Sequence, residues 1–258
     1  MNNNLRLAII ASLVAIIITG SMDTLGYGMY SAFVLIPLIP LFAKLGGISR
    51  AELGYVVGPL RQYPFAVIAP LLAVGLLTLL VTLLGVTEPT RDEWGMVAIV
   101  LVFNSVVGVL AVAITEEGFF RGTLYSLLHN AGQSKNQILW TTTLVFVVWH
   151  LSAVLIDEAY SPALFQVPIY LVNATLLGLI WGLQRELTGS IWPGAIYHSI
   201  WNAFVYQLYG FGTDSGDLAA EPTWIYGPEI GIAGIVLSGS VVLFLFKQRA
   251  ATSSRNSL

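Results

Sequence analysis

Two of the three histidines in this chain lie within long apolar stretches, where ionisable side chains are costly and usually functional. These are His150 and His198, and a pair of acids, Glu116 and Glu117, ends a third apolar stretch. Asn202 follows His198 by one helical turn and adds an amide that can donate hydrogen bonds. A carboxylate, two imidazoles and an amide can together serve one buried hydrolytic site.

The acidic pair is followed by a basic residue at helical spacing. In a helix, Glu117 and Arg121 are i and i+4 with the acid first, which is the favourable order for an ion pair. Glu116 then projects about 100° away and has no local partner, so it is the candidate general base. In the alternative reading, the helix ends near residue 115 and the charges lie at the membrane interface.

Each histidine has a companion one turn away on the same helical face. Phe146 precedes His150 by four residues, and Asn202 follows His198 by four. Taken alone, His150 could be an ordinary core residue, and His198 with Asn202 could be polar contacts between helices. Taken together, the residues predict that Glu116 and His150 activate a water while His198 and Asn202 stabilise the oxyanion.

The composition limits which kind of protein can carry this site. Of 258 residues, 56% are hydrophobic and 10% charged, with a mean hydropathy of +0.79 and a net charge of −3. These values exclude a disordered chain, a nucleic-acid binder and an ordinary water-soluble enzyme. There is no cysteine, which excludes disulfides, thiolate metal sites and a cysteine nucleophile. A polytopic membrane protein remains.

Eight windows are long and apolar enough to span a bilayer as helices. They are residues 7–22, 28–43, 64–86, 95–115, 137–156, 166–184, 190–209 and 227–246. The sequence therefore predicts an all-α integral membrane protein of about eight transmembrane helices, forming one polytopic domain over residues 1–258. The first window could instead be the apolar part of a signal peptide.

The basic residues predict the orientation. With a cytoplasmic N-terminus, ten of the eleven Lys and Arg residues fall on the inner side and only Arg91 falls outside, so both termini are expected in the cytoplasm. The acidic residues expected on the outer side are Asp23, Glu88, Asp92, Glu93, Asp157, Glu158, Asp214, Asp217, Glu221 and Glu229.

Glu116 and His150 can meet only if the fourth helix continues past its apolar window. His150 lies about 20 Å from the inner end of its helix, whereas Glu116 follows directly after residue 115. We therefore expect a continuous helix from about Phe103 to about Leu128, with Glu116 near its middle. Residues 95–102 would be an outer, partly interfacial stretch.

Three segments resemble, in order, the EExxxR, FxxxH and HxxxN motifs of the CPBP family, which comprises CAAX-processing intramembrane endopeptidases and bacteriocin-immunity or abortive-infection proteins. They are Glu116-Glu117-Gly118-Phe119-Phe120-Arg121, Phe146-Val147-Val148-Trp149-His150 and His198-Ser199-Ile200-Trp201-Asn202. No motif position departs from the pattern. The resemblance covers a core of about residues 95–210, with accessory helices and tails at 1–94 and 211–258.

The resemblance implies a membrane-embedded catalytic cavity that opens towards the cytoplasm and the lipid, and an endopeptidase that cleaves near the cytoplasmic face. Catalysis would fall to Glu116, His150, His198 and Asn202, with Glu117, Arg121 and Phe146 as supporting residues. The preferred mechanism requires no cofactor, but a zinc ion on Glu116, His150 and His198 is the alternative. The expected partners are membrane lipid and a protein or prenylated-peptide substrate, without nucleic acid, in a multi-pass protein of the cell membrane.

Two functions of other classes stay open. The chain could be a non-catalytic membrane scaffold or bacteriocin-immunity protein that keeps the motif residues for structure. A small-solute transporter with a buried proton relay is disfavoured, because no inverted repeat is evident in the sequence.

Overall fold

The computed structural model describes residues 2–211 and 215–255, and within these ranges it is all-helical without a strand. An isolated antiparallel bridge between Thr87 and Ala220 is the β-type contact that it contains. The predicted all-α membrane fold is thereby confirmed. Asp214, expected in an outer loop, lies outside the described residues.

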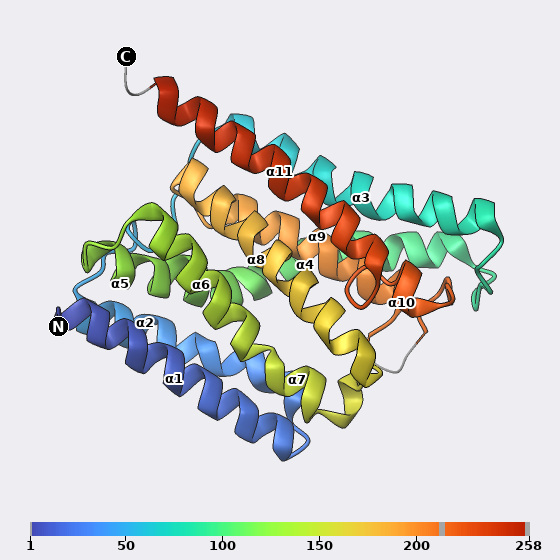
Figure 1. The fold of residues 1–258 in the computed structure, drawn as a ribbon, viewed down its shortest axis with the longest axis horizontal. Coiled ribbons are helices and arrows are strands. Elements are labelled where there is room, and N and C mark those ends of the chain that lie inside the picture. The colour runs from blue at the N-terminus through green and yellow to red at the C-terminus, as the bar shows by residue number, and fades with distance from the viewer. Residues whose placement is uncertain (1, 212–214, 256–258) are drawn as a thin grey trace.

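The helices follow one another through short connections (Figure 1). The α-helices are α1 (Asn3–Thr24), α2 (Leu35–Gly46), α3 (Tyr63–Leu84), α4 (Trp94–Ile114), α5 (Tyr125–Asn130), α6 (Lys135–Trp149), α7 (Leu151–Leu155), α8 (Val167–Thr188), α9 (Trp192–Tyr209), α10 (Thr223–Tyr226) and α11 (Ile232–Arg255). A π-helix, η3 (Glu117–Leu124), joins α4 to α5. Four 3-10 segments complete the described chain: Gly28–Val34, Leu60–Gln62, Glu158–Tyr160 and Leu164–Gln166.

Within the part of the chain that the structure describes, seven helical segments are long and apolar enough to cross a membrane. They are Asn3–Thr24, Gly28–Gly46, Leu60–Leu84, Trp94–Asn130, Lys135–Leu155, Leu164–Thr188 and Ile232–Thr252. The remaining predicted window, residues 190–209, corresponds to α9, which has 18 residues but is too polar to qualify by composition. Helix α9 packs against α3, α4 and α8, and most of its side chains are buried, so it can carry polar groups that a lipid-facing helix could not.

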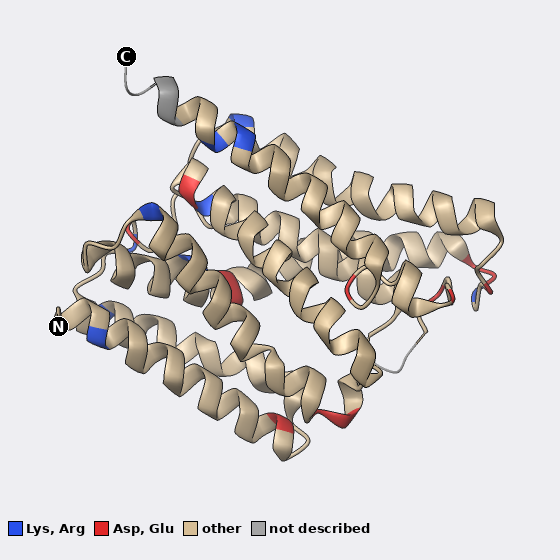
Figure 2. Ribbon diagram, in the orientation of Figure 1, with Lys and Arg blue, Asp and Glu red and all other residues tan. Residues whose placement is uncertain are grey.

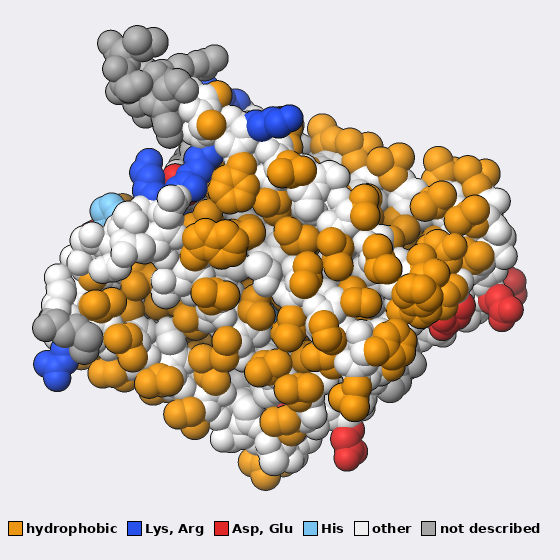
Figure 3. All heavy atoms as spheres, in the orientation of Figure 1, with side chains coloured by type: hydrophobic (Ala, Val, Ile, Leu, Met, Phe, Trp, Pro, Cys, Tyr) orange, Lys and Arg blue, Asp and Glu red, His pale blue; other side chains and the backbone are white. Residues whose placement is uncertain are grey.

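Hydrophobic side chains cover the sides of the bundle and charges gather at its ends. Figure 3 shows apolar side chains spread over one face. Figure 2 shows Lys and Arg concentrated at the end where α1 begins and α11 finishes, and most Asp and Glu at the opposite end. We call these the basic end and the acidic end. Arg91 lies at the acidic end, where its Nε is 3.0 Å from Asp217 Oδ1.

The fourth helix does continue past its apolar window, but with a local distortion. One helical segment runs from Trp94 to Asn130, and it includes the expected outer stretch at residues 95–102. At Thr115 the backbone leaves helical geometry, with φ −118° and ψ −102°, and the π-helix begins two residues later. The Tyr55 hydroxyl donates a hydrogen bond of 2.8 Å to the Ala113 carbonyl beside this break. The prediction of an unbroken helix is thus corrected at one residue.

Glycine makes the distorted turn possible. A Cβ atom on Gly118 would lie 2.5 Å from both the Ala113 carbonyl oxygen and the Tyr55 hydroxyl. Only a residue without a side chain fits there. Glycine at this position therefore leaves room both for the wide turn and for the Tyr55 hydroxyl beside the helix break. π-turns of this kind are frequent at functional sites, because they redirect side chains within a helix.

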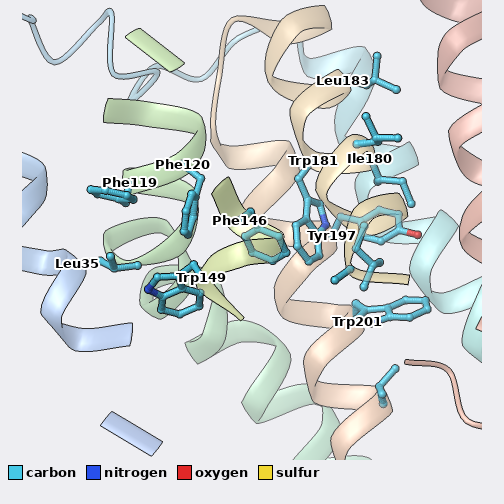
Figure 4. Close-up of a cluster of buried hydrophobic side chains, with 14 of the residues drawn as sticks. Leu35, Phe119, Phe120, Phe146, Trp149, Ile180, Trp181, Leu183, Tyr197 and Trp201 are labelled. Atoms are coloured by element: carbon cyan, nitrogen blue, oxygen red, sulfur yellow. The ribbon is translucent and has the colours of Figure 1, made fainter. Parts of the chain in front are cut away.

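An aromatic cluster lies between the π-helix, α6 and α8 (Figure 4). The Phe120 ring meets the Phe146 ring edge-on at 5.2 Å, and Phe146 meets Trp181 in the same way at 5.5 Å. All three side chains are buried. Edge-to-face packing of this kind holds the three helical segments in a fixed register.

Candidate active site

Glu117 and Arg121 form a fully buried ion pair. Arg121 Nη1 lies 3.3 Å from Glu117 Oε1, and both side chains have 0% exposure. The guanidinium also donates from Nη2 to the Gly178 carbonyl at 3.0 Å and lies 4.7 Å from the centre of the Phe146 ring. Paired charges with additional hydrogen bonds are the form in which buried ions are tolerated. The structure thus contains the ion pair that the spacing predicts.

Glu117 also orients the first of the two buried histidines. His198 Nδ1 lies 3.1 Å from Glu117 Oε1, and its ring stacks on Trp181 with centroids 3.7 Å apart. The contact between Glu117 and His198 was missed in the sequence, because it depends on how α9 packs against the π-helix. It gives the supporting acid a direct role in positioning the imidazole.

The second histidine is held by its own helix. His150 ends α6, and its Nδ1 lies 2.9 Å from the Phe146 carbonyl oxygen one turn earlier. Its ring packs against Phe146 at 4.3 Å. Because a carbonyl oxygen can only accept, Nδ1 carries the proton and Nε2 is left as an acceptor in the neutral ring.

Both histidines present Nε2 to the same carboxylate oxygen. Glu116 Oε2 lies 3.8 Å from His150 Nε2 and 3.9 Å from His198 Nε2. These separations are longer than direct hydrogen bonds, so the three groups surround a common point without being bonded to one another. The π-helix, α6 and α9 therefore bring together the three groups that the sequence singled out for acid–base chemistry.

These groups line a small cavity inside the bundle. It leaves about 40 Å³ for the centres of water-sized spheres, which is enough for a few water molecules. Asn202 lies on its wall, one turn beyond His198 on α9. The lining residues are Glu116, Phe146, His150, Tyr170, Asn173, Ala174, Leu177, Trp181, His198, Asn202, Tyr206 and Glu229.

A much larger groove meets this cavity. It has a volume of about 700 Å³ and runs between α4 and α9 from Gly108 and Asn202 to Arg91 and Asp217 at the acidic end. Asn202 and Tyr206 line both spaces. Asn202 thus lies where a wide, open groove joins the confined cavity that holds the histidines.

Glu229 also lines the cavity, although its position in the sequence groups it with the acidic residues expected on the outer side. Its Oε2 accepts a hydrogen bond from the Tyr160 hydroxyl at 3.0 Å, and its Oε1 accepts one from Trp201 Nε1 at 3.2 Å. It lies in the connection between α10 and α11, outside the candidate spans. Burial raises the pKa of this carboxyl, and the two hydrogen bonds oppose that shift. A lone acid beside an apolar span is the signal that could have identified it.

The third histidine takes no part in the site. His129 is exposed on α5 near the basic end, and its Nδ1 lies 3.4 Å from Asn130 Oδ1. It is the solvated residue that its polar surroundings indicate.

The zinc alternative requires a tighter arrangement than the described residues have. Three atoms bound to one tetrahedral zinc at about 2.1 Å would lie roughly 3.4 Å apart, whereas Glu116 Oε2 is 3.8 and 3.9 Å from the two Nε2 atoms. Among the described residues, no group of three or more His, Cys, Asp or Glu side chains is arranged to hold a metal ion. We therefore derive no step through a metal.

Comparison with known proteins identifies the region that carries the site. Residues 97–204 match the family model described as Rce1-like, Type II CAAX prenyl endopeptidase Rce1-like. The matched region runs from α4 to α9 and contains the motif residues from Glu116 to Asn202. No curated protein and no solved structure matches the chain. The family inferred from the three motifs is thereby confirmed.

Proposed function

Because residues 97–204 match the Rce1-like family model, we propose that this chain is an intramembrane endopeptidase that cleaves a prenylated C-terminal peptide with a water activated by Glu116 and His150. One observation carries this proposal: histidines from two different helices direct Nε2 at the same oxygen of Glu116, inside a buried cavity. The protein would act in the cell membrane, with lipid as its surroundings.

The tautomer of His150 suits it to hold the attacking water. Its Nδ1–H donates to the Phe146 carbonyl, so Nε2 and the Glu116 carboxylate are both acceptors and can each take one hydrogen of the same water. Glu116 then removes one proton as the water oxygen attacks the peptide carbonyl, and returns it to the leaving nitrogen. General acid–base catalysis of this kind typically contributes about 10²- to 10⁴-fold to the rate.

His198 and Asn202 would stabilise the oxyanion. His198 Nδ1 lies against Glu117 and its Nε2 faces the cavity towards Glu116; an imidazolium in this position has one N–H for Glu117 and one for the oxyanion. The Asn202 amide can donate from the next turn of α9. Both residues lie on the helix that borders the groove, so a peptide in the groove would bring its carbonyl to them.

The test compares wild type with Glu116→Gln on a fluorogenic farnesylated C-terminal peptide, using purified protein in detergent. Wild type should cleave it and Glu116→Gln should lose at least about 10²-fold in rate. Glu88→Gln, an exposed residue of the α3–α4 connection, is the matched control and should keep full activity. Parallel reactions with EDTA and 1,10-phenanthroline test whether the reaction depends on a metal.

Two results would contradict the proposal. Cleavage that survives in Glu116→Gln would remove the glutamate from the mechanism. If neither wild type nor any variant cleaves the farnesylated peptide or an unprenylated peptide, the result would favour a non-catalytic scaffold or an immunity protein.

A further inference from the structure

Glu229 is a half-buried carboxylate in the catalytic cavity that the proposed mechanism does not use. It shares the cavity with Glu116, His150, His198 and Asn202. Its connection is fixed in place, since Asn173 Nδ2 donates to the Glu229 carbonyl at 2.8 Å and to the Gly231 carbonyl at 3.1 Å. The carboxylate is therefore held at the cavity wall by contacts on its backbone and on both of its oxygens.

No Lys or Arg balances the charge of Glu229. Arg121 accompanies Glu117, and within the described chain no Lys or Arg lies within ion-pair distance of Glu229. The two histidines of the same cavity are held by other acceptors, His150 by the Phe146 carbonyl and His198 by Glu117. A carboxylate largely removed from solvent without a counter-ion of its own is costly unless a cation is present during function.

Hydrolysis of a peptide bond supplies such a cation. The water oxygen bonds to the carbonyl carbon, the carbon–nitrogen bond breaks, and the nitrogen leaves with the bonding electron pair. Both water protons end on that nitrogen, one through Glu116 and one from the new carboxylic acid. The amide N–H thus becomes an ammonium group, and the other product is a carboxylate.

We propose that Glu229 forms the subsite that receives the amino group of the leaving peptide. The proposal rests on the proposed function, and it follows from charge complementarity within one cavity. Glu116 and His150 face the water, His198 and Asn202 face the oxyanion, and Glu229 is the remaining anionic group for the one cationic product. Each carboxylate oxygen can accept a second hydrogen bond beyond those from Tyr160 and Trp201.

Glu229 could instead have a purely structural role, which the variants below distinguish from the subsite. Glu229 joins Tyr160 in the α7–α8 connection to Trp201 on α9, so it could serve only to hold these segments together. Glu229→Gln separates the two roles, because the amide can accept from the Trp201 N–H and donate to the Tyr160 oxygen while carrying no charge. Trp201→Phe removes one of the hydrogen bonds and keeps the charge. Glu221→Gln, which changes an exposed acid just before α10 that does not line the cavity, is the matched control.

The first experiment compares a farnesylated peptide with its depsipeptide, in which the scissile N–H is replaced by oxygen. The ester releases an alcohol, which does not become a cation. In Glu229→Gln we expect kcat/KM to fall about tenfold or more for the peptide and to change less than about twofold for the ester. Equal losses on both substrates, or no loss on the peptide, would overturn the subsite.

A binding measurement keeps the subsite testable apart from catalysis. The probes are the free tripeptide Val-Ile-Met and its N-acetylated form, added to wild type and Glu229→Gln in a thermal unfolding assay. Wild type should be stabilised by the free amine more than by the acetylated peptide, and Glu229→Gln should lose this preference. If wild type cleaves neither substrate, the proposed function fails, whereas equal binding of the two tripeptides to wild type overturns the subsite.

Discussion

In the cavity, the partner of each histidine Nδ1 determines what its Nε2 can do. His150 donates to a backbone carbonyl and so offers a lone pair, whereas His198 directs its Nδ1 at the carboxylate of Glu117. Two imidazoles at similar distances from Glu116 thus differ in chemistry because their second contacts differ. This difference supports water activation for His150 and oxyanion binding for His198.

Asn202 is the residue whose replacement should separate binding from catalysis. Asn202→Ala removes an amide at the junction of groove and cavity, so kcat should fall about 10²- to 10³-fold while KM changes little. Asn104→Ala is the matched control, since it removes an amide from the α4 side of the same groove. Steady-state kinetics on the farnesylated peptide measures both, and equal losses in the two variants would argue against an oxyanion role.

The ion pair of Glu117 and Arg121 should matter mainly for stability. Arg121→Met leaves Glu117 buried without its cation, so the free energy of unfolding should fall by about 3–5 kcal/mol. Lys135→Met removes the cation of a pair whose lysine is 72% exposed and should cost less than about 1 kcal/mol. Unfolding midpoints in detergent compare the two, and similar midpoints would show that the buried pair contributes little.

At this scale the sequence identifies residues more readily than contacts. Few ionisable residues lie in or directly after the apolar spans. Glu116, His150 and His198 can therefore be selected from their positions in the sequence alone. Glu229 is missed because it falls at the outer end of its predicted window, 227–246, and is grouped with the exposed acids. The contact of Glu117 with His198 joins residues 81 positions apart, and no local spacing rule predicts it.

At the scale of elements, the π-helix is the feature that sequence periodicity could not provide. The need to bring Glu116 close to His150 predicts a helix through Glu116, and the structure contains one, but Thr115 departs from helical geometry. A contact from a distant part of the chain accompanies this distortion, since Tyr55 donates to the carbonyl of Ala113 and packs where a Gly118 side chain would be. Helical periodicity reports which face is apolar and says little about such a local distortion.

Gly118→Ala tests whether this turn positions the acids. The added methyl group meets the Ala113 carbonyl oxygen at 2.5 Å, so the turn must shift, at a cost of about 1–3 kcal/mol and with loss of activity. Gly75→Ala in α3 is the control, because its Cβ meets nothing within 4 Å and it should be neutral or slightly stabilising. Wild-type activity and stability in Gly118→Ala would show that the turn tolerates a side chain.

At the scale of the whole molecule, hydropathy predicts the lipid-facing helices better than the buried one. Seven segments qualify as spans, whereas α9, which carries His198 and Asn202, does not. Neighbouring helices shield α9, so its composition reflects the site rather than the lipid. Among the predicted windows, the one that carries the motif residues His198 and Asn202 is therefore the one that does not qualify as a span.

The orientation of the bundle follows from its charges, and labelling can test it. The chain has no cysteine, so Asn136→Cys at the basic end and Glu88→Cys at the acidic end each introduce a single thiol at an exposed position. With the basic end in the cytoplasm, a membrane-impermeant maleimide should label Glu88→Cys in intact cells and Asn136→Cys only after permeabilisation. The reverse pattern would contradict the orientation.

The same labelling bears on the route of the substrate. The groove leads from Asn202 to Arg91 and Asp217 at the acidic end, whereas the family resemblance implies a cavity that opens towards the cytoplasm. A peptide that enters along the groove from the cytoplasm would require the acidic end to face inwards, against the distribution of Lys and Arg. If labelling places the acidic end outside, a cytoplasmic peptide must instead reach Asn202 laterally, between α4 and α9, and the farnesyl chain would enter from the lipid along the same path.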